Sequence, residues 1–147
     1  MEQKYFARRF SDLIVYQRAC QISATVFNLS KKFPHEEMFA LTDQIRRSSR
    51  SIGAHISEAW AKRRYEKAFL NKLTDADGEQ LETQHWIGVA GDCGYITSED
   101  ANLLTASLDE IGRMLHGMID KATLFTVGDA RQTQEADGPS RRRQSLR

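Results

Sequence analysis

The chain is poor in cysteine and proline and has no long apolar run, and each shortage excludes a class of protein. Its two cysteines, Cys20 and Cys93, are too few for a disulfide framework, which favours a reducing, cytoplasmic location. No apolar stretch approaches the roughly 20 residues of a membrane-spanning helix, and residues 1–9 lack the apolar core of a signal peptide. Valine- and threonine-rich alternation with frequent turn signals is also missing, so the sequence does not indicate strands. An all-α fold is therefore expected.

Apolar residues recur at three- and four-residue spacing in four segments, which predicts four amphipathic helices. We expect them over residues 12–31, from 36 through 60, over 65–93 and from 98 to about 125. The second helix should bury Met38, Leu41, Ile45, Ser48, Ile52, Ile56 and Ala59. The fourth should bury Leu104, Leu108, Ile111, Leu115, Met118 and Ala122, a heptad-like seam suited to a left-handed bundle.

Local signals mark the ends of these helices. Pro34 should end the first and Gly94 the third, while Thr97, with Asp100 three residues later, should cap the fourth. Because the connections are short, the predicted fold is an antiparallel up-down-up-down four-helix bundle over residues 10–125. An N-terminal extension (1–9) precedes it, and a disordered, basic C-terminal tail (126–147) follows it.

The formal net charge of +1 hides a division of charge along the chain. Residues 46–67 carry seven basic side chains and two acidic ones, whereas residues 74–112 contain nine acidic side chains and neither lysine nor arginine. A basic corner of this kind is a candidate phosphate-backbone surface, because lysine and arginine release counterions from nucleic acid. The alternative is a solvated surface that pairs with acidic helices of the same or a neighbouring chain. The candidate nucleic-acid-binding residues are Arg46, Arg47, Arg50, Lys62, Arg63, Arg64 and Lys67.

One carboxylate, Glu58, continues the region of the apolar stripe in the second helix. A carboxylate near a bundle core must be paired, and three arginines lie on the preceding turns. We expect a structural ion pair or a hydrogen-bond hub there. The candidate hub residues are Gln44, Ser51, His55 and Glu58.

A Glu-x-x-His pair, Glu82 and His85, matches the ligand pair of di-iron bundles, and His55 with Glu58 repeats it in reverse. Such a site needs a second forward pair and a glutamate from each remaining helix, which this sequence does not supply. We therefore expect no metal, no cofactor and no catalytic residues, with a di-metal enzyme as a remote alternative.

Several motifs resemble the bacterial "four helix bundle protein" family, which includes proteins encoded in intervening sequences of large-subunit ribosomal RNA genes. They are FSDLIVYQ (residues 10–17), FPHEE (33–37) and LTDQIRRSSRSIGAHISEA (41–59), with KLTDADGE (72–79) typical of one branch. The family usually has Asn-Ile-Ala-Glu-Gly where this chain has residues 55–59, ending in Ala59. Because alanine lacks the freedom of glycine, the second helix should continue into Trp60.

This resemblance implies an antiparallel bundle without enzymatic activity that forms a ring-like homopentamer. A more distant relative, the accessory variability determinant of diversity-generating retroelements, binds reverse transcriptase and structured RNA through a basic surface. The resemblance thus implies an oligomeric scaffold whose partners are itself and structured RNA or a nucleic-acid-processing protein, with no membrane. The alternative function is a purely structural or protein-interaction module.

Overall fold

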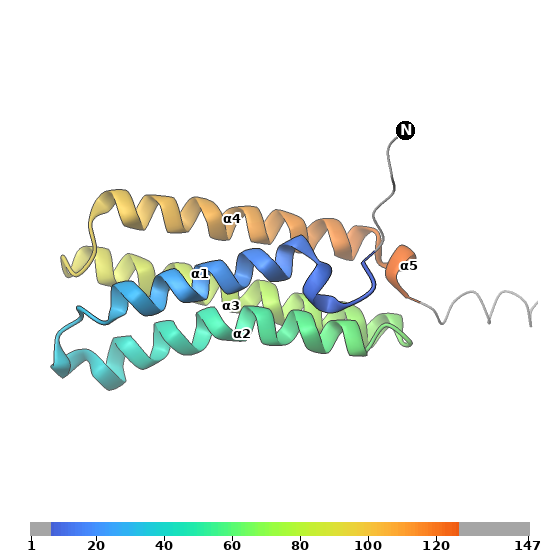
Figure 1. The fold of residues 1–147 in the computed structure, drawn as a ribbon, viewed down its shortest axis with the longest axis horizontal. Coiled ribbons are helices and arrows are strands. Elements are labelled where there is room, and N and C mark those ends of the chain that lie inside the picture. The colour runs from blue at the N-terminus through green and yellow to red at the C-terminus, as the bar shows by residue number, and fades with distance from the viewer. Residues whose placement is uncertain (1–6, 127–147) are drawn as a thin grey trace, which may run out of the picture.

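The computed structural model describes residues 7–126, which form four long helices packed side by side (Figure 1). They are α1 (Ile14–Ser30), α2 (Asp43–Ala61), α3 (Glu66–Asp92) and α4 (Ser98–Asp120). Four short elements accompany them: η1 (Phe10–Asp12), η2 (His35–Glu37), η3 (Met38–Thr42) and α5 (Ala122–Phe125). The α1–α2 and α3–α4 connections lie at one end and the α2–α3 connection at the other (Figure 1). The predicted all-α bundle is confirmed. Residues 1–6 of the predicted N-terminal extension (1–9) and residues 127–147 of the predicted tail (126–147) lie outside the described residues.

The core forms where the apolar faces of the four long helices meet. The predicted stripe is buried from Leu41 of η3 through Ala59 of α2, whereas Met38 at its start is only half-buried. Helix α4 buries its predicted leucine and isoleucine positions (Leu104, Leu108, Ile111 and Leu115), but Met118 is half-buried, and the buried Ala122 belongs to α5. Full burial of one such side chain contributes about 1.5–3 kcal/mol, so these seams supply most of the drive for folding. The outer faces are polar, and none of the helices between residues 7 and 126 is both long and apolar enough to cross a bilayer.

The helix ends with a local chemical signal lie where the sequence predicted them. Gly94 adopts a φ of 75°, the left-handed conformation that ends a helix and that glycine accepts without strain. The Thr97 hydroxyl accepts a 3.1 Å hydrogen bond from the Asp100 backbone N–H and caps α4. Helix α2 continues past Ala59 to Ala61, as the replacement of glycine by alanine predicted.

Two expected boundaries were wrong. The second helix does not begin as α-helix at residue 36, because η2 is a 3-10 turn and η3 is a π-helix closed by the bond from Asp43 N–H to the Met38 carbonyl. This wide turn directs two consecutive residues, Leu41 and Thr42, into the core. The fourth helix is interrupted at Lys121, and the restart in α5 stacks Phe125 on Phe69 with ring centroids 5.9 Å apart.

Candidate nucleic-acid interface

The basic residues of segment 46–67 form two clusters at opposite ends of α2. Arg46, Arg47 and Arg50 lie in its first turns. Lys62, Arg63 and Arg64 lie at the α2–α3 connection, and Lys67 lies in the first turn of α3. At a rise of 1.5 Å per residue, the 12 positions from Arg50 to Lys62 separate the nearest members of the two clusters by about 18 Å. The continuous basic corner expected from the sequence is therefore divided, and each cluster has to be judged separately.

The first cluster surrounds the ring of Phe27, which α1 contributes. The Lys31 ammonium and the Arg46 guanidinium lie 4.8 Å from the ring centroid, and the Arg50 guanidinium lies at 5.3 Å. Each cation–π contact is worth about 0.5–1 kcal/mol at an exposed site. The Arg46 Nε also donates a 2.7 Å hydrogen bond to the Ser30 hydroxyl. Helix α1 thus positions two arginines of α2. We call Lys31, Arg46, Arg47 and Arg50 the Phe27 cluster.

No carboxylate neutralises the Phe27 cluster within ion-pair distance. Over residues 7–126 the ion pairs within 4.0 Å involve Arg18 and Lys72 and, where the ring is protonated, His55 and His116; none of these belongs to the cluster. Asp43 shares a shallow hollow with Arg46, Arg47 and Arg50, and it balances one of the four positive charges. The remaining positive potential attracts phosphate groups.

The second cluster, at the α2–α3 connection, contains an arginine with a structural role. The Arg63 guanidinium lies 3.5 Å from the centroid of the Trp60 ring, and its Nε donates a 2.8 Å hydrogen bond to the Trp60 carbonyl. Burial lowers the pKa of Arg63, although an arginine of this kind stays protonated near neutral pH. Arg63 thus satisfies a carbonyl at the end of α2. Arg64 and Lys67 are exposed, as is Lys62.

The four candidate hub residues share one side of α2 but contact different partners. Glu58 forms a 2.6 Å ion pair with Lys72 of α3, and this hydrogen bond lowers the pKa of Glu58 and raises that of Lys72. His55 Nε2 lies 3.7 Å from Glu79 Oε1, and Ser51 donates a hydrogen bond to the carbonyl of Arg47. Gln44 is half-buried near the start of the helix. Glu58 therefore ties α2 to α3 rather than to the arginines on its own helix.

The residues considered for a di-metal site make other contacts. The His85 ring packs edge-on against Trp86 at 4.7 Å, and Glu58 is occupied by Lys72. Burial and a hydrogen bond with Glu82 raise the pKa of Glu79, whereas His55 lowers it. Within the described part of the chain, no three His, Cys, Asp or Glu side chains are arranged to hold a metal ion.

A polar network between α3 and α4 has no counterpart in the sequence predictions. Gln80, which is 4% exposed, donates to Asp77 at 3.0 Å and accepts from Gln84 at 2.8 Å. Gln84 also donates to Asp109 of α4, and His116 of α4 lies 3.2 Å from Asp77. None of these polar residues lies on a predicted apolar stripe, and Gln80 is buried all the same, so apolar spacing alone does not reveal the network.

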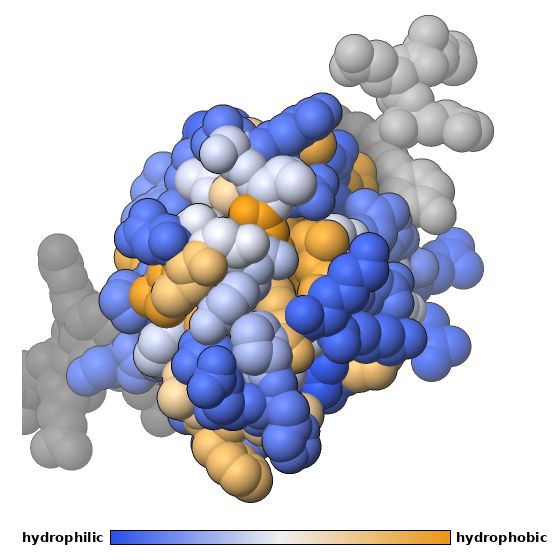
Figure 2. Space-filling model, turned by 90° about the vertical axis from the view of Figure 1, so that its left-hand side faces the viewer, coloured by the Kyte–Doolittle hydropathy of each residue, from blue (hydrophilic) through white to orange (hydrophobic). Residues whose placement is uncertain are grey.

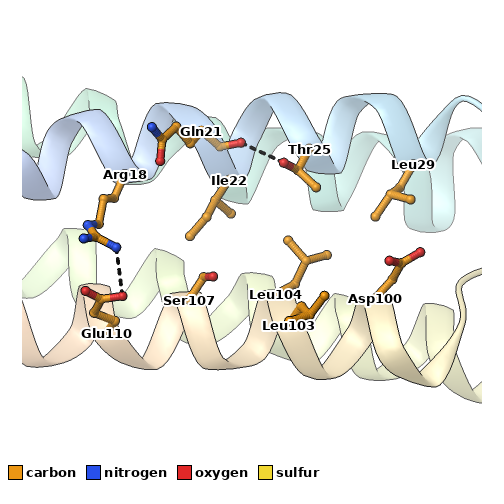
Figure 3. A pocket seen from close by; sticks show the side chains of 10 residues that line it. All are labelled: Arg18, Gln21, Ile22, Thr25, Leu29, Asp100, Leu103, Leu104, Ser107 and Glu110. Carbon is orange, nitrogen blue, oxygen red and sulfur yellow. Dashed lines mark hydrogen bonds and ion pairs between the residues drawn. The ribbon is translucent and has the colours of Figure 1, made fainter.

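A cleft of about 290 Å³ separates α1 from α4 (Figure 3). The pair between Arg18 and Glu110, at 3.0 Å, joins the two helices at one end of it. Ile22 and Leu104 both point into the cleft farther along, and Asp100 lies near the other end. The charges of Arg18 and Glu110 are mutually satisfied, so this cleft provides no free cation for an anionic ligand.

Comparison with known proteins identifies the family of this chain. Residues 11–117 match the model of the 23S rRNA-intervening sequence protein family. The chain belongs to this family. A crystal structure of a member of the S23 ribosomal protein family from Bacteroides thetaiotaomicron, of unknown function, superposes with a TM-score of 0.65 at 32% identity. The match covers 72% of this chain and 98% of the Bacteroides protein, whereas no curated protein matches. Family membership thus agrees with the resemblance seen in the motifs.

Proposed function

We propose that this intervening-sequence protein is a non-enzymatic, oligomeric scaffold that binds structured RNA, or a nucleic-acid-processing partner, through the Phe27 cluster. The observation that carries the proposal is a set of four cations that share a single neighbouring carboxylate, Asp43, and form no ion pair within 4.0 Å; α1 holds two of them in place. The family description, which refers to an intervening sequence of 23S rRNA, supplies an RNA context.

The arrangement of the arginines supports binding to a phosphate backbone. Arg46 and Arg50 are one helical turn apart, about 6 Å between their Cβ atoms, and contact with Phe27 limits their rotamers. Side chains that are ordered before binding lose less conformational entropy on association. Arg47, exposed beside them, adds a third cation.

Charge segregation supports assembly. The basic start of α2 and the acid-only segment 74–112 of α3 and α4 are complementary, so a head-to-tail contact between copies can close into a ring. We propose a homopentamer on the basis of the family resemblance. Sedimentation of the intact protein measures the mass, and a monomer at micromolar concentration would refute this part of the proposal.

RNA binding is tested by fluorescence anisotropy with a labelled RNA hairpin at increasing salt. Affinity should fall steeply as salt rises, and Arg47→Gln/Arg50→Gln should lower the slope of log K against log salt by about 2. The control Arg113→Gln removes an exposed cation of α4 and should leave the slope nearly unchanged. Absence of affinity at low salt would refute RNA binding. If the double variant changes the mass of the assembly instead, the arginines form subunit contacts and the structural-module alternative is favoured.

A further inference from the structure

Phe39 is the most exposed large apolar side chain among the described residues, at 82%. It lies in η3, immediately before α2, at the end of the bundle that carries the α1–α2 connection. Figure 2 looks onto this end, where apolar surface emerges among hydrophilic side chains. A phenylalanine ring exposed to water does not gain the hydrophobic free energy of burial, so the exposure of Phe39 suggests a function for it.

The π-helix holds Phe39 outward. Leu41 and Thr42 of the same turn are 1% and 2% exposed, so the turn is fixed to the core on its other side. A rotation that buried Phe39 would bring these two side chains into solvent. π-helical turns are rare and are frequent at functional sites. The ring is thus a fixed feature of the surface rather than the tip of a loose loop.

The exposed side of this continuous helical segment also carries two arginines of the Phe27 cluster, Arg47 and Arg50. Phe39, Asp43, Arg47 and Arg50 follow one another at steps of four, four and three residues. Eight residues separate Phe39 from Arg47, which is about 12 Å along a helix. An aromatic ring and two arginines that form no ion pair within 4.0 Å therefore share one strip of surface, with Asp43 between the ring and the arginines.

The chemistry of this strip selects among possible occupants. A neutral apolar peptide would cover Phe39 but leave the arginines without counter-charges, and an inorganic anion would leave the ring exposed. A nucleotide outside a duplex satisfies both, because its base stacks on an aromatic ring while the adjacent phosphates pair with arginine. In a continuous duplex the bases stack on each other and have no free face.

We propose that Phe39 is a stacking platform for an unpaired base of a loop or bulge in RNA, whose flanking phosphates are held by Arg46, Arg47 and Arg50. This inference rests on the proposed RNA binding and adds to it a preference for unpaired nucleotides. The platform sets the preference between loop and duplex, and the arginines set the affinity common to both.

The test compares an RNA hairpin that carries 2-aminopurine in its loop with a blunt duplex of the same length. The intact protein should bind the hairpin more tightly and quench the 2-aminopurine fluorescence on stacking. Phe39→Ala should weaken hairpin binding about tenfold and abolish the quenching, with duplex binding unchanged. Phe39→Trp should restore both properties. Leu124→Ala, which shortens another exposed apolar side chain at the opposite end, is the matched control and should change neither.

The outcomes separate this inference from the proposed function. If Phe39→Ala binds the hairpin as tightly as the intact protein does, with the salt dependence preserved, the platform is refuted while RNA binding stands. If the substitution instead changes the mass of the assembly, Phe39 is a contact between copies of the chain, and the platform is again refuted. If the intact protein binds neither RNA, both proposals fail.

Discussion

Gly112 of α4 faces the polar network of α3, and replacing it with alanine tests how that network is packed. A Cβ at this position would lie 3.0 Å from the Gln80 amide nitrogen and 3.5 Å from an Asp77 carboxylate oxygen. The nearer contact is tighter than an ordinary van der Waals approach, so the Gln80 amide has to move. Because Gln80 is buried and uses its amide in two hydrogen bonds, little room exists for that movement.

Two opposing effects determine the size of the change. Gly→Ala inside a helix stabilises a protein by about 1 kcal/mol through its higher helix propensity. Leaving one buried polar group without its partner costs about 1–3 kcal/mol, and displacement of Gln80 threatens its bonds to both Asp77 and Gln84. We therefore expect Gly112→Ala to lower the free energy of unfolding by about 1–2 kcal/mol. Gly88→Ala of α3, where a Cβ would meet no atom within 4 Å, should instead raise it by about 1 kcal/mol.

Urea denaturation followed by circular dichroism measures both variants. A double-mutant cycle then assigns the cause: in a Gln80→Ala background, Gly112→Ala should become stabilising, because the obstructing amide is gone. The explanation is refuted if Gly112→Ala stabilises the intact protein as much as Gly88→Ala does. It is also refuted if the loss persists unchanged when Gln80 is absent.

Two further predictions concern the cap of α4 and the pH dependence of stability. Thr97→Ala should cost about 1 kcal/mol in urea denaturation, because the N–H of Asp100 loses its acceptor, and an equal loss in the control Thr123→Ala would contradict the capping role. Glu79 has a raised pKa, so the folded protein retains this proton to higher pH than the unfolded chain, and stability should fall as pH rises from about 4.5 through the folded-state pKa. Thermal unfolding of Glu79→Gln should lack this decline. Glu58 has a lowered pKa, so its ionised form stabilises the fold at pH values above the ordinary pKa of glutamate, and this stability is lost as the pH falls. Glu58→Gln should therefore lack part of the loss of stability in acid, and identical pH profiles for the two variants would argue against both assignments.

The helices and the core were predictable because their signals are local and periodic. Burial of Leu108 or Ile56 follows from the spacing of apolar residues, and the ends at Gly94 and Thr97 follow from the chemistry of single residues. The π-turn of η3 was missed because apolar spacing does not report the width of a turn. The break at Lys121 was missed because it serves a tertiary contact, the stacking of Phe125 on Phe69.

The candidate interface was predictable only in composition. Clustering in the sequence identified the arginines of α2. Because α2 is a straight helix, however, basic residues at its two ends lie far apart in space, so the one basic segment forms two clusters. The partners of these side chains come from other helices: Phe27 and Ser30 of α1 hold Arg46, and Lys72 of α3 pairs with Glu58. Such pairings depend on how the helices pack, which no single segment encodes.

The net charge of the chain is close to zero, but its basic side chains differ in what they contact. Arg18 and Lys72 are neutralised by carboxylates, and Arg63 is held by Trp60, so these three stabilise the bundle. Arg46 and Arg50 instead stand one turn apart with like charge, which destabilises a helix by about 0.2–0.5 kcal/mol. Contact with Phe27, worth about 0.5–1 kcal/mol for each arginine, outweighs this cost but leaves the repulsion between the two charges in place. A polyanion would screen the repulsion that remains in the free protein, so the pair of arginines favours a complex with phosphate groups.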